Sequence, residues 1–260
     1  VFNVVNGAKT IVEALCDHSD IKAVAFVGSS NIAKIVYNRC SQNSKRSLCL
    51  GGAKNHMIVV PDADTDSTAK GLLASSMGSA GQRCMAASVA VGVANIDHII
   101  DQLIEEARSF KLGVDMGTII SKNALDRITG YIDEAEKMGA KILVDGRDIS
   151  PPDGYERGYW LGATILDGVD PDWPSAKEEI FGPVLSIIRA GTIEEAMKIE
   201  NDNPYGNAAA VFTTSGQIAK VVSEKASAGM VGINIGVPVP RDPYSFGGWN
   251  ESKYGHGDIT

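Results

Sequence analysis

One stretch decides the fold class: Ala23-Val24-Ala25-Phe26-Val27-Gly28-Ser29-Ser30, an apolar run that ends in a Gly-Ser turn. Residues 31–40 follow with the spacing of an amphipathic helix, and residues 46–50 form a second short strand-like run. The order of strand, Gly-Ser turn and helix is that of half a nucleotide-binding unit. Because free N–H groups and the helix dipole favour a phosphate there, Gly28 and Ser29 are candidate phosphate contacts. Many proteins use the same pair simply as a turn and helix cap, and that alternative stays open.

The alternation of apolar runs and amphipathic stretches continues outward to both ends of the chain. Strands are predicted at residues 57–60, 88–93, 141–145, 184–188 and 208–212, and helices at residues 10–18, 65–79, 97–110, 123–139, 192–203 and 215–228. This pattern is typical of an α/β fold with a mostly parallel sheet. We predict three parts: residues 1–50, a second α/β unit at residues 51–232, and a final segment at residues 233–260 that is rich in Gly, Pro and aromatic residues.

Composition excludes several classes of partner. The 260 residues include 24 Lys and Arg against 32 Asp and Glu, a net charge of −8, and basic residues cluster no further than Lys45-Arg46. Such a chain has no surface that would follow a phosphate backbone or an anionic bilayer, so we expect no nucleic-acid partner. Every apolar run is interrupted before the roughly 18 residues that span a membrane, so no membrane partner is expected either.

The four cysteines carry no metal-binding or disulfide pattern. Cys16, Cys40, Cys49 and Cys84 form no C-x-x-C pair and have no histidine at ligand spacing. We therefore expect no metal site and a reducing compartment. The four histidines are scattered, so no Cys-His dyad is predicted.

The richest chemistry lies in Gly78-Ser79-Ala80-Gly81-Gln82-Arg83-Cys84-Met85-Ala86, a turn of small residues between a predicted helix and a predicted strand. Small residues allow a substrate to approach the Cys84 thiol, and free backbone N–H groups there could hold a developing oxyanion. The Arg83 guanidinium could stabilise the thiolate or pair with a substrate carboxylate. The alternatives are an inert buried cysteine and an ordinary surface salt bridge.

Four motifs together resemble the aldehyde dehydrogenase superfamily. They are Gly81-Gln82-Arg83-Cys84-Met85, Lys177-Glu178-Glu179-Ile180-Phe181-Gly182-Pro183-Val184, Asn203-Pro204-Tyr205-Gly206-Asn207 and Ser245-Phe246-Gly247-Gly248. The stretches 52–64 and 232–240, with the Arg before the Cys, are similar to the CoA-acylating methylmalonate-semialdehyde and malonate-semialdehyde dehydrogenases within it. The resemblance covers essentially the whole chain but only about the C-terminal half of a family member.

The resemblance implies a fold and a set of roles. Residues 1–50 would be part of a Rossmann-type NAD-binding domain, residues 51–232 the catalytic domain, and residues 233–260 a segment returning toward the cofactor domain and the oligomer interface. Cys84 would attack the aldehyde and Arg83 would bind the substrate. Gly28 and Ser29 would contact NAD, Glu179 would hold the nicotinamide ribose, and Phe181 would pack beside the ring. Without the family, Glu179 and Phe181 read as a helix-end carboxylate and a core aromatic.

One departure from the superfamily bears on the reaction. Most members have a Glu that activates water in a Glu-Leu-Gly-Gly-Lys motif, but the matching stretch here is Leu48-Cys49-Leu50-Gly51-Gly52-Ala53-Lys54. A thioester on Cys84 would accumulate unless another thiol removed it, and CoA is an intrinsically good nucleophile. The expected reaction is therefore NAD-dependent oxidation of methylmalonate or malonate semialdehyde to propionyl-CoA or acetyl-CoA. Cys49 as a replacement catalytic residue is the weaker alternative to a packed strand residue.

Two other functions stay open. The chain could be a truncated, catalytically incomplete family member, because several family parts would lie before Val1; such a chain is expected to be unstable or sticky. It could instead be a hydrolytic aldehyde dehydrogenase that releases a free acid. The resemblance further implies a small-molecule semialdehyde substrate, a homo-oligomer in full-length form, and a location in the cytoplasm or the mitochondrial matrix.

Overall fold

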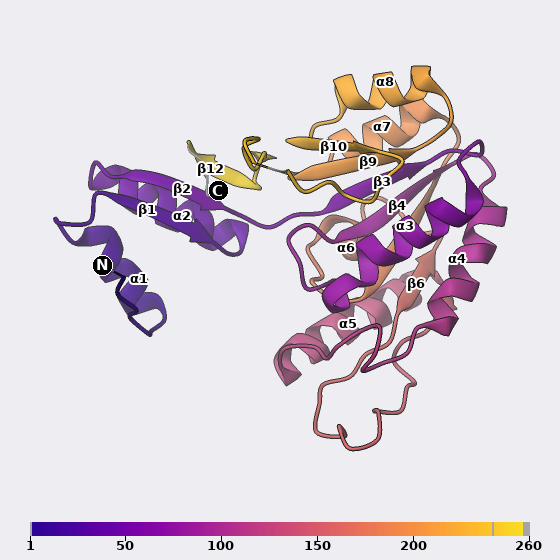
Figure 1. Ribbon diagram of the computed structural model, residues 1–260, viewed down its shortest axis with the longest axis horizontal. Helices are drawn as coiled ribbons and strands as arrows, with labels where there is room; N and C mark the ends of the chain where they lie inside the picture. Colours follow the sequence, from indigo (N-terminus) through magenta and orange to yellow (C-terminus); the bar gives the residue numbers. More distant parts are fainter. Residues whose placement is uncertain (1, 241, 257–260) are drawn as a thin grey trace.

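The computed structural model describes residues 2–240 and 242–256 of the chain. Figure 1 shows a small unit beside a large one, joined by the connection from β2 to β3 and by the C-terminal segment. The small unit consists of helices α1 and α2 on a three-stranded sheet, whereas the large unit is built on a seven-stranded sheet. The predicted α/β fold is confirmed.

The small unit forms where the sequence predicts a strand, a turn and a helix. Its elements are α1 (Lys9–Asp17), β1 (Ala23–Val27), α2 (Ser30–Gln42), β2 (Arg46–Leu50) and β12 (Lys253–Gly255). Strands β1 and β2 pair in parallel, and β12 returns from the far end of the chain to pair antiparallel with β2. Buried side chains of α1, α2 and β2 form its small core, in which Cys16, Cys40 and Cys49 pack together.

The large sheet is mostly parallel. Its strands lie in the order β10, β9, β3, β4, β7, β6 and β5, and only the β5–β6 pair is antiparallel. Their bounds are β3 (Asn55–Val59), β4 (Ala87–Val93), β5 (Lys141–Val144), β6 (Thr164–Asp167), β7 (Val184–Ala190), β9 (Ala208–Phe212) and β10 (Met230–Ile233). The central strands are buried along almost their whole length, as expected for a parallel sheet covered by helices.

Six helices accompany this sheet: α3 (Thr65–Met77), α4 (Asp97–Ser109), α5 (Lys122–Met138), α6 (Pro174–Lys177), α7 (Ile193–Asn201) and α8 (Gly216–Lys225). Helices α3 and α4 pack against each other, and α7 and α8 lie together beside β9 and β10 (Figure 1). A short antiparallel pair, β8 (Tyr205–Gly206) and β11 (Trp249–Asn250), holds the C-terminal segment against the large unit. No helix in the described ranges is long and apolar enough to cross a bilayer.

The structure corrects the sequence prediction at several points. Strands β6 and β10, and the short β8, β11 and β12, were not predicted, because two to four residues are too few to show alternation. The helix predicted at residues 65–79 ends at Met77, since Ser79, Ala80 and Gly81 have left-handed φ values of 53°, 53° and 66°.

The small unit presents apolar side chains on its surface. Strand β1 is an edge of its sheet, and Val27 at its end is 61% exposed. On helix α2, Ile32 and Ile35 are 45% and 56% exposed. These side chains, together with the open strand edge, are the kind of surface that the sequence analysis expects for part of a dinucleotide-binding domain.

Candidate active site

A cleft of about 810 Å³ lies between the small and the large unit. Gly28 and Ser29 line it from the small unit, and Arg83, Cys84, Glu179 and Phe181 line it from the large unit. The fold thus brings to one cleft all six residues that the sequence analysis singles out, from three separate segments of the chain. Val27, Gly51, Gln82, Met85, Arg127 and Val239 complete the lining.

The turn that carries Cys84 is tightly folded between α3 and β4. Three consecutive residues, Ser79 to Gly81, adopt left-handed φ, a conformation that costs energy for residues with a side chain. Gly81 is required by a close approach, because a Cβ there would lie 2.0 Å from the carbonyl oxygen of Gly182. The turn is therefore locked against the loop that carries Glu179 and Phe181, and Cys84 follows it as a partly exposed free thiol.

Burial has the largest effect on the Cys84 thiol and raises its pKa above the ordinary value. The negative charge of Glu179 raises the pKa further. Hydrogen bonds from the backbone N–H groups of Cys84 and Met85 act in the opposite direction, and the charge of Arg83 adds the smallest lowering effect. The thiolate is thus supported mainly by backbone N–H groups, and less by the guanidinium that the sequence analysis emphasised.

Arg83 turns its guanidinium toward the end of helix α3. Its Nη2 donates hydrogen bonds of 2.9 and 3.0 Å to the carbonyl oxygens of Ala74 and Ser75 in the last turn of that helix, and the Ala74 carbonyl also accepts the N–H of Gly78. Arg83 forms no ion pair within the described residues, so the alternative of a surface salt bridge is wrong. Its Nε is buried and has no hydrogen-bond partner, so the hydrogen-bonding capacity of the guanidinium is only partly satisfied within the described residues.

Glu179 is held at the base of the cleft. Its Oε1 accepts a 3.0 Å hydrogen bond from the backbone N–H of Ala53 in the β2–β3 connection. Burial raises the pKa of the Glu179 carboxyl, while the Ala53 N–H and the charges of Lys54 and Arg127 lower it. Arg127 is a cleft residue that the sequence analysis missed: it lies on helix α5, outside any motif, and donates a 2.7 Å hydrogen bond to the carbonyl of Ile180.

Phe181 is not buried in the core, which is where its sequence alone, without the family resemblance, would place it. It is 38% exposed, has a left-handed φ of 54° and faces the cleft. A bulky residue in this conformation is strained, and such strain is concentrated at functional sites.

Ser29 stands at the cap position of helix α2, but its side chain makes no capping hydrogen bond. It is exposed and lines the cleft, so its hydroxyl can contact a ligand. The neighbouring Ser30 takes the structural role, because its Oγ donates to Glu251 O at 2.7 Å and accepts from Gly52 N at 3.0 Å. The start of a 13-residue helix therefore opens onto the cleft with a free hydroxyl beside it.

Cys49 lies away from the cleft. It is fully buried in strand β2, and burial raises its pKa to about 11. Leu50, the other residue at the position of the missing Glu, is 6% exposed in the same strand. The structure therefore favours the packed strand residue over a catalytic role for Cys49.

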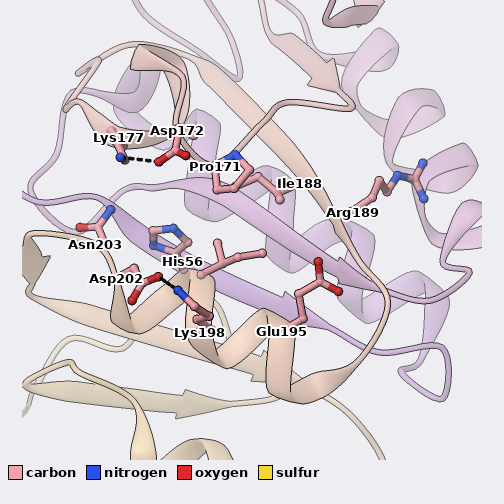
Figure 2. A pocket seen from close by; sticks show the side chains of 12 residues that line it. His56, Pro171, Asp172, Lys177, Ile188, Arg189, Glu195, Lys198, Asp202 and Asn203 are labelled. Carbon is pink, nitrogen blue, oxygen red and sulfur yellow. Dashed lines mark hydrogen bonds and ion pairs between the residues drawn. The ribbon is translucent and has the colours of Figure 1, made fainter.

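A second cleft of about 390 Å³ lies on the large unit beside α6 and α7 (Figure 2). Four of its charged side chains form two ion pairs, Lys177 with Asp172 at 2.5 Å and Lys198 with Asp202. His56 is 3% exposed there, its Nδ1 lies 2.8 Å from Lys54 O, and burial lowers its pKa to about 4. This cleft holds none of the residues that the sequence analysis singles out. In the part of the chain that the structure describes, no cluster of three or more potential ligands could hold a metal ion.

Comparison with known proteins shows clear similarity along the whole chain. A family model for the aldehyde dehydrogenase family matches residues 1–260. The malonate-semialdehyde dehydrogenase of Pseudomonas aeruginosa is 42% identical over 98% of the chain, which covers 53% of that protein. The mitochondrial acylating methylmalonate-semialdehyde dehydrogenase of Arabidopsis thaliana is 45% identical over 100% of the chain, which covers 43% of it.

Among solved structures, a Sinorhizobium meliloti protein assigned as a methylmalonate-semialdehyde dehydrogenase, in complex with NAD, superposes with a TM-score of 0.95 and 45% identity. The match covers 98% of the chain and 53% of that structure. The chain thus spans about half the length of the relatives it matches.

Proposed function

The chain belongs to the aldehyde dehydrogenase family, and we propose on that premise that it carries the catalytic cysteine of an NAD-dependent, CoA-acylating semialdehyde dehydrogenase. The substrate is malonate or methylmalonate semialdehyde, in line with the names of its relatives. The observation that carries the proposal is the cleft that Cys84, Arg83 and Glu179 line together, opposite the start of helix α2.

The residues present fit a dinucleotide. At one side of the cleft, the helix start with the unbonded Ser29 hydroxyl suits a pyrophosphate. At the other side, the Glu179 carboxylate suits a ribose hydroxyl and the exposed Phe181 ring suits a nicotinamide. The bound cofactor supplies the hydride acceptor. Arg127 beside Glu179 adds a positive charge to this part of the cleft.

The roles of the chain's own residues follow from covalent catalysis. The Cys84 thiol loses its proton to solvent and its sulfur adds to the aldehyde carbon; loss of hydride from that carbon leaves a thioester on Cys84. The Arg83 guanidinium binds the substrate carboxylate. The acyl groups of the CoA products contain one carbon fewer than the semialdehydes, so this carboxyl group departs as CO₂ and a proton replaces it. Attack of the CoA thiol on the thioester carbon then releases the Cys84 thiolate.

Transfer to CoA rather than to water is supported by the carboxylates of the cleft. Among the described residues, Glu179 is the one acidic side chain that lines it, and one of its oxygens is engaged by the Ala53 N–H. The position of the family's water-activating Glu is taken by buried strand residues, Cys49 and Leu50. The family's water-activating Glu is therefore missing from this site, whereas a thiol needs less activation.

The test is NAD reduction, followed by absorbance, on adding malonate or methylmalonate semialdehyde with and without CoA. We expect reduction that depends on CoA and disappears in Cys84→Ala. Free acid formed at the same rate without CoA would contradict the proposal and favour the hydrolytic enzyme.

A second candidate, a catalytically incomplete family member, is favoured by the exposed apolar side chains of the small unit. Neither NAD binding nor reduction, from a folded chain, would support it. The full-length protein is proposed to act as a homo-oligomer in the cytoplasm or the mitochondrial matrix; the Arabidopsis thaliana relative is named as mitochondrial.

A further inference from the structure

Two asparagine side chains hold the backbone of the Cys84 segment. Nδ2 of Asn55 donates to the carbonyl oxygens of Cys84, at 3.0 Å, and of Ala86, at 2.9 Å. Nδ2 of Asn207 donates to the same Cys84 carbonyl at 3.3 Å. The Cys84 carbonyl oxygen thus accepts two side-chain amide donors, one from each of two different segments.

These two side chains occupy a special place in the sheet. Asn55 begins β3 and is 1% exposed, and Asn207 precedes β9 and is 5% exposed. The β3–β4 pairing shifts register directly after Asn55, so its side chain takes the place of backbone pairing at this end of the two strands. Its Oδ1 accepts a 3.0 Å hydrogen bond from Ala208 N, so a single amide joins β3, β9 and the segment leading into β4.

The Cys84 carbonyl has an electronic link to the thiol. It belongs to the same peptide group as the N–H of Met85, one of the two backbone N–H groups that lower the pKa of the Cys84 thiol. Donors on a peptide carbonyl polarise the group and strengthen its N–H as a donor, by about 10–30% per bond. An N–H donor stabilises a thiolate more than a thiol, because the acceptor is charged.

We propose that Asn55 and Asn207 are positioning residues for the nucleophile: their amides orient and polarise the Cys84–Met85 peptide so that its N–H stabilises the Cys84 thiolate. This inference rests on the proposed function of Cys84. The charged groups that act on the thiol are Glu179 and Arg83, and neither is altered by substituting the two asparagines.

The experiment measures the rate of iodoacetamide alkylation of Cys84 against pH, with the modified residue identified by mass spectrometry. In Asn55→Ala we expect the midpoint of the profile to move to higher pH, with alkylation about threefold slower at pH 7.5. Asn207→Ala removes one of the two donors and should give a smaller shift in the same direction. If Asn55→Ala does not fold, the shift of the alkylation midpoint in Asn207→Ala alone tests the inference.

Asn203→Ala is the matched control. Asn203 is 8% exposed and its Oδ1 accepts a 2.8 Å hydrogen bond from Tyr205 N, but it does not contact the Cys84 segment. A merely loosened structure would raise the alkylation rate at every pH and leave the midpoint in place; that result in folded variants would overturn the inference. A wild-type Cys84 no more reactive than the buried Cys16, Cys40 and Cys49 would instead contradict the proposed function.

Discussion

The backbone N–H of Ala53 donates a 3.0 Å hydrogen bond to Oε1 of Glu179. Ala53 lies in the connection between the two units and Glu179 in the loop before β7, 126 residues later in the chain. This bond ties the cleft carboxylate to the connection at which the small unit meets the large one. Because the carboxylate is partly buried near the Cys84 thiol, its charge acts directly on the nucleophile.

Replacing Glu179 with Gln should make Cys84 more reactive. The Gln oxygen can still accept from the Ala53 N–H, but the negative charge that raises the Cys84 pKa is gone. Thiolate then forms at lower pH, and we expect iodoacetamide to modify Cys84 about two- to threefold faster at pH 7.5. Unchanged or slower alkylation would show that the charge does not act on the thiol. Under the proposed function, the same variant should bind NAD more weakly in a titration.

Two glycine substitutions should have opposite effects on stability. Gly81→Ala places a Cβ 2.0 Å from Gly182 O at a φ of +66°, and should lower the free energy of unfolding by at least about 2 kcal/mol. Gly130→Ala, within helix α5 and with open space around its Cα, should raise it by about 0.5–1 kcal/mol. Urea denaturation of both variants measures the difference. A tolerated Gly81→Ala would mean that the turn before Cys84 can rearrange.

Glu200 should make the protein less stable as the pH rises toward neutrality. It is 5% exposed, and burial raises its pKa from 4.5 to about 7. Between these values the unfolded chain has lost the proton that the folded chain keeps. The contribution of Glu200 to stability is therefore fully present below pH 4.5 and is lost as the pH rises to about 7. Glu200→Gln keeps an oxygen for Ser227 N and should be more stable than wild type by about 3 kcal/mol at pH 8, with little difference at pH 4.

The control for this change lies on the same helix. Glu194 is exposed on α7, so Glu194→Gln should alter stability by less than about 0.5 kcal/mol at either pH. Thermal unfolding at pH 4, 6 and 8 distinguishes the two variants. Parallel stability profiles for wild type and Glu200→Gln would contradict the assignment of a protonated Glu200.

Lys54 makes the stability of the protein depend on pH between about 7 and 10.5, and its contribution rises with pH, whereas that of Glu200 falls. Its ammonium is 2% exposed with no hydrogen-bond partner among the described residues, and burial lowers its pKa from 10.5 to about 7. The unfolded chain binds a proton there that the folded chain does not, so stability falls as the pH drops from 10.5 to about 7. Lys54→Met should therefore stabilise the protein by about 1–4 kcal/mol at pH 8.

The exposed Lys34 on helix α2 provides the comparison, since Lys34→Met should change stability by less than about 0.5 kcal/mol. Thermal unfolding between pH 7 and pH 10.5 is the measurement. If Lys54→Met destabilises the chain at pH 8, the buried ammonium makes a favourable interaction that outweighs its desolvation.

Local patterns predict the elements well where they are long enough. Strands β1, β2 and β9 have the bounds that their apolar runs indicate, and the seven helices predicted from their spacing begin within one residue of their observed starts. Strand β12 is three residues long and pairs with β2 some 200 positions away in the chain, so no neighbouring residue marks it as a strand. The early end of α3 also has a distant cause, the close approach of Gly81 to Gly182.

The residues of the site also fall into those that a local motif identifies and those that only the packing reveals. Motifs identified Cys84, Glu179 and Ser29 because each stands in a distinctive run of residues, and all three line one cleft. Arg127 stands in an ordinary helical stretch, and its place in the cleft comes only from the packing of α5 against the loop at Ile180. Asn207 contacts Cys84 across 123 positions, a relationship that no spacing reveals.

The sequence by itself determined the α/β alternation, the glycine-rich turn before Cys84 and the absence of a water-activating Glu, because these depend on residue types at short separation. The tertiary structure alone decided which groups act on the thiol. Burial raises the pKa of the Cys84 thiol, and Arg83 Nη2 donates its hydrogen bonds to carbonyl oxygens near the end of α3. Both effects arise when the sheet, the helices and the connection between the two units come together, since solvent exclusion and hydrogen bonds then join residues that the chain keeps far apart.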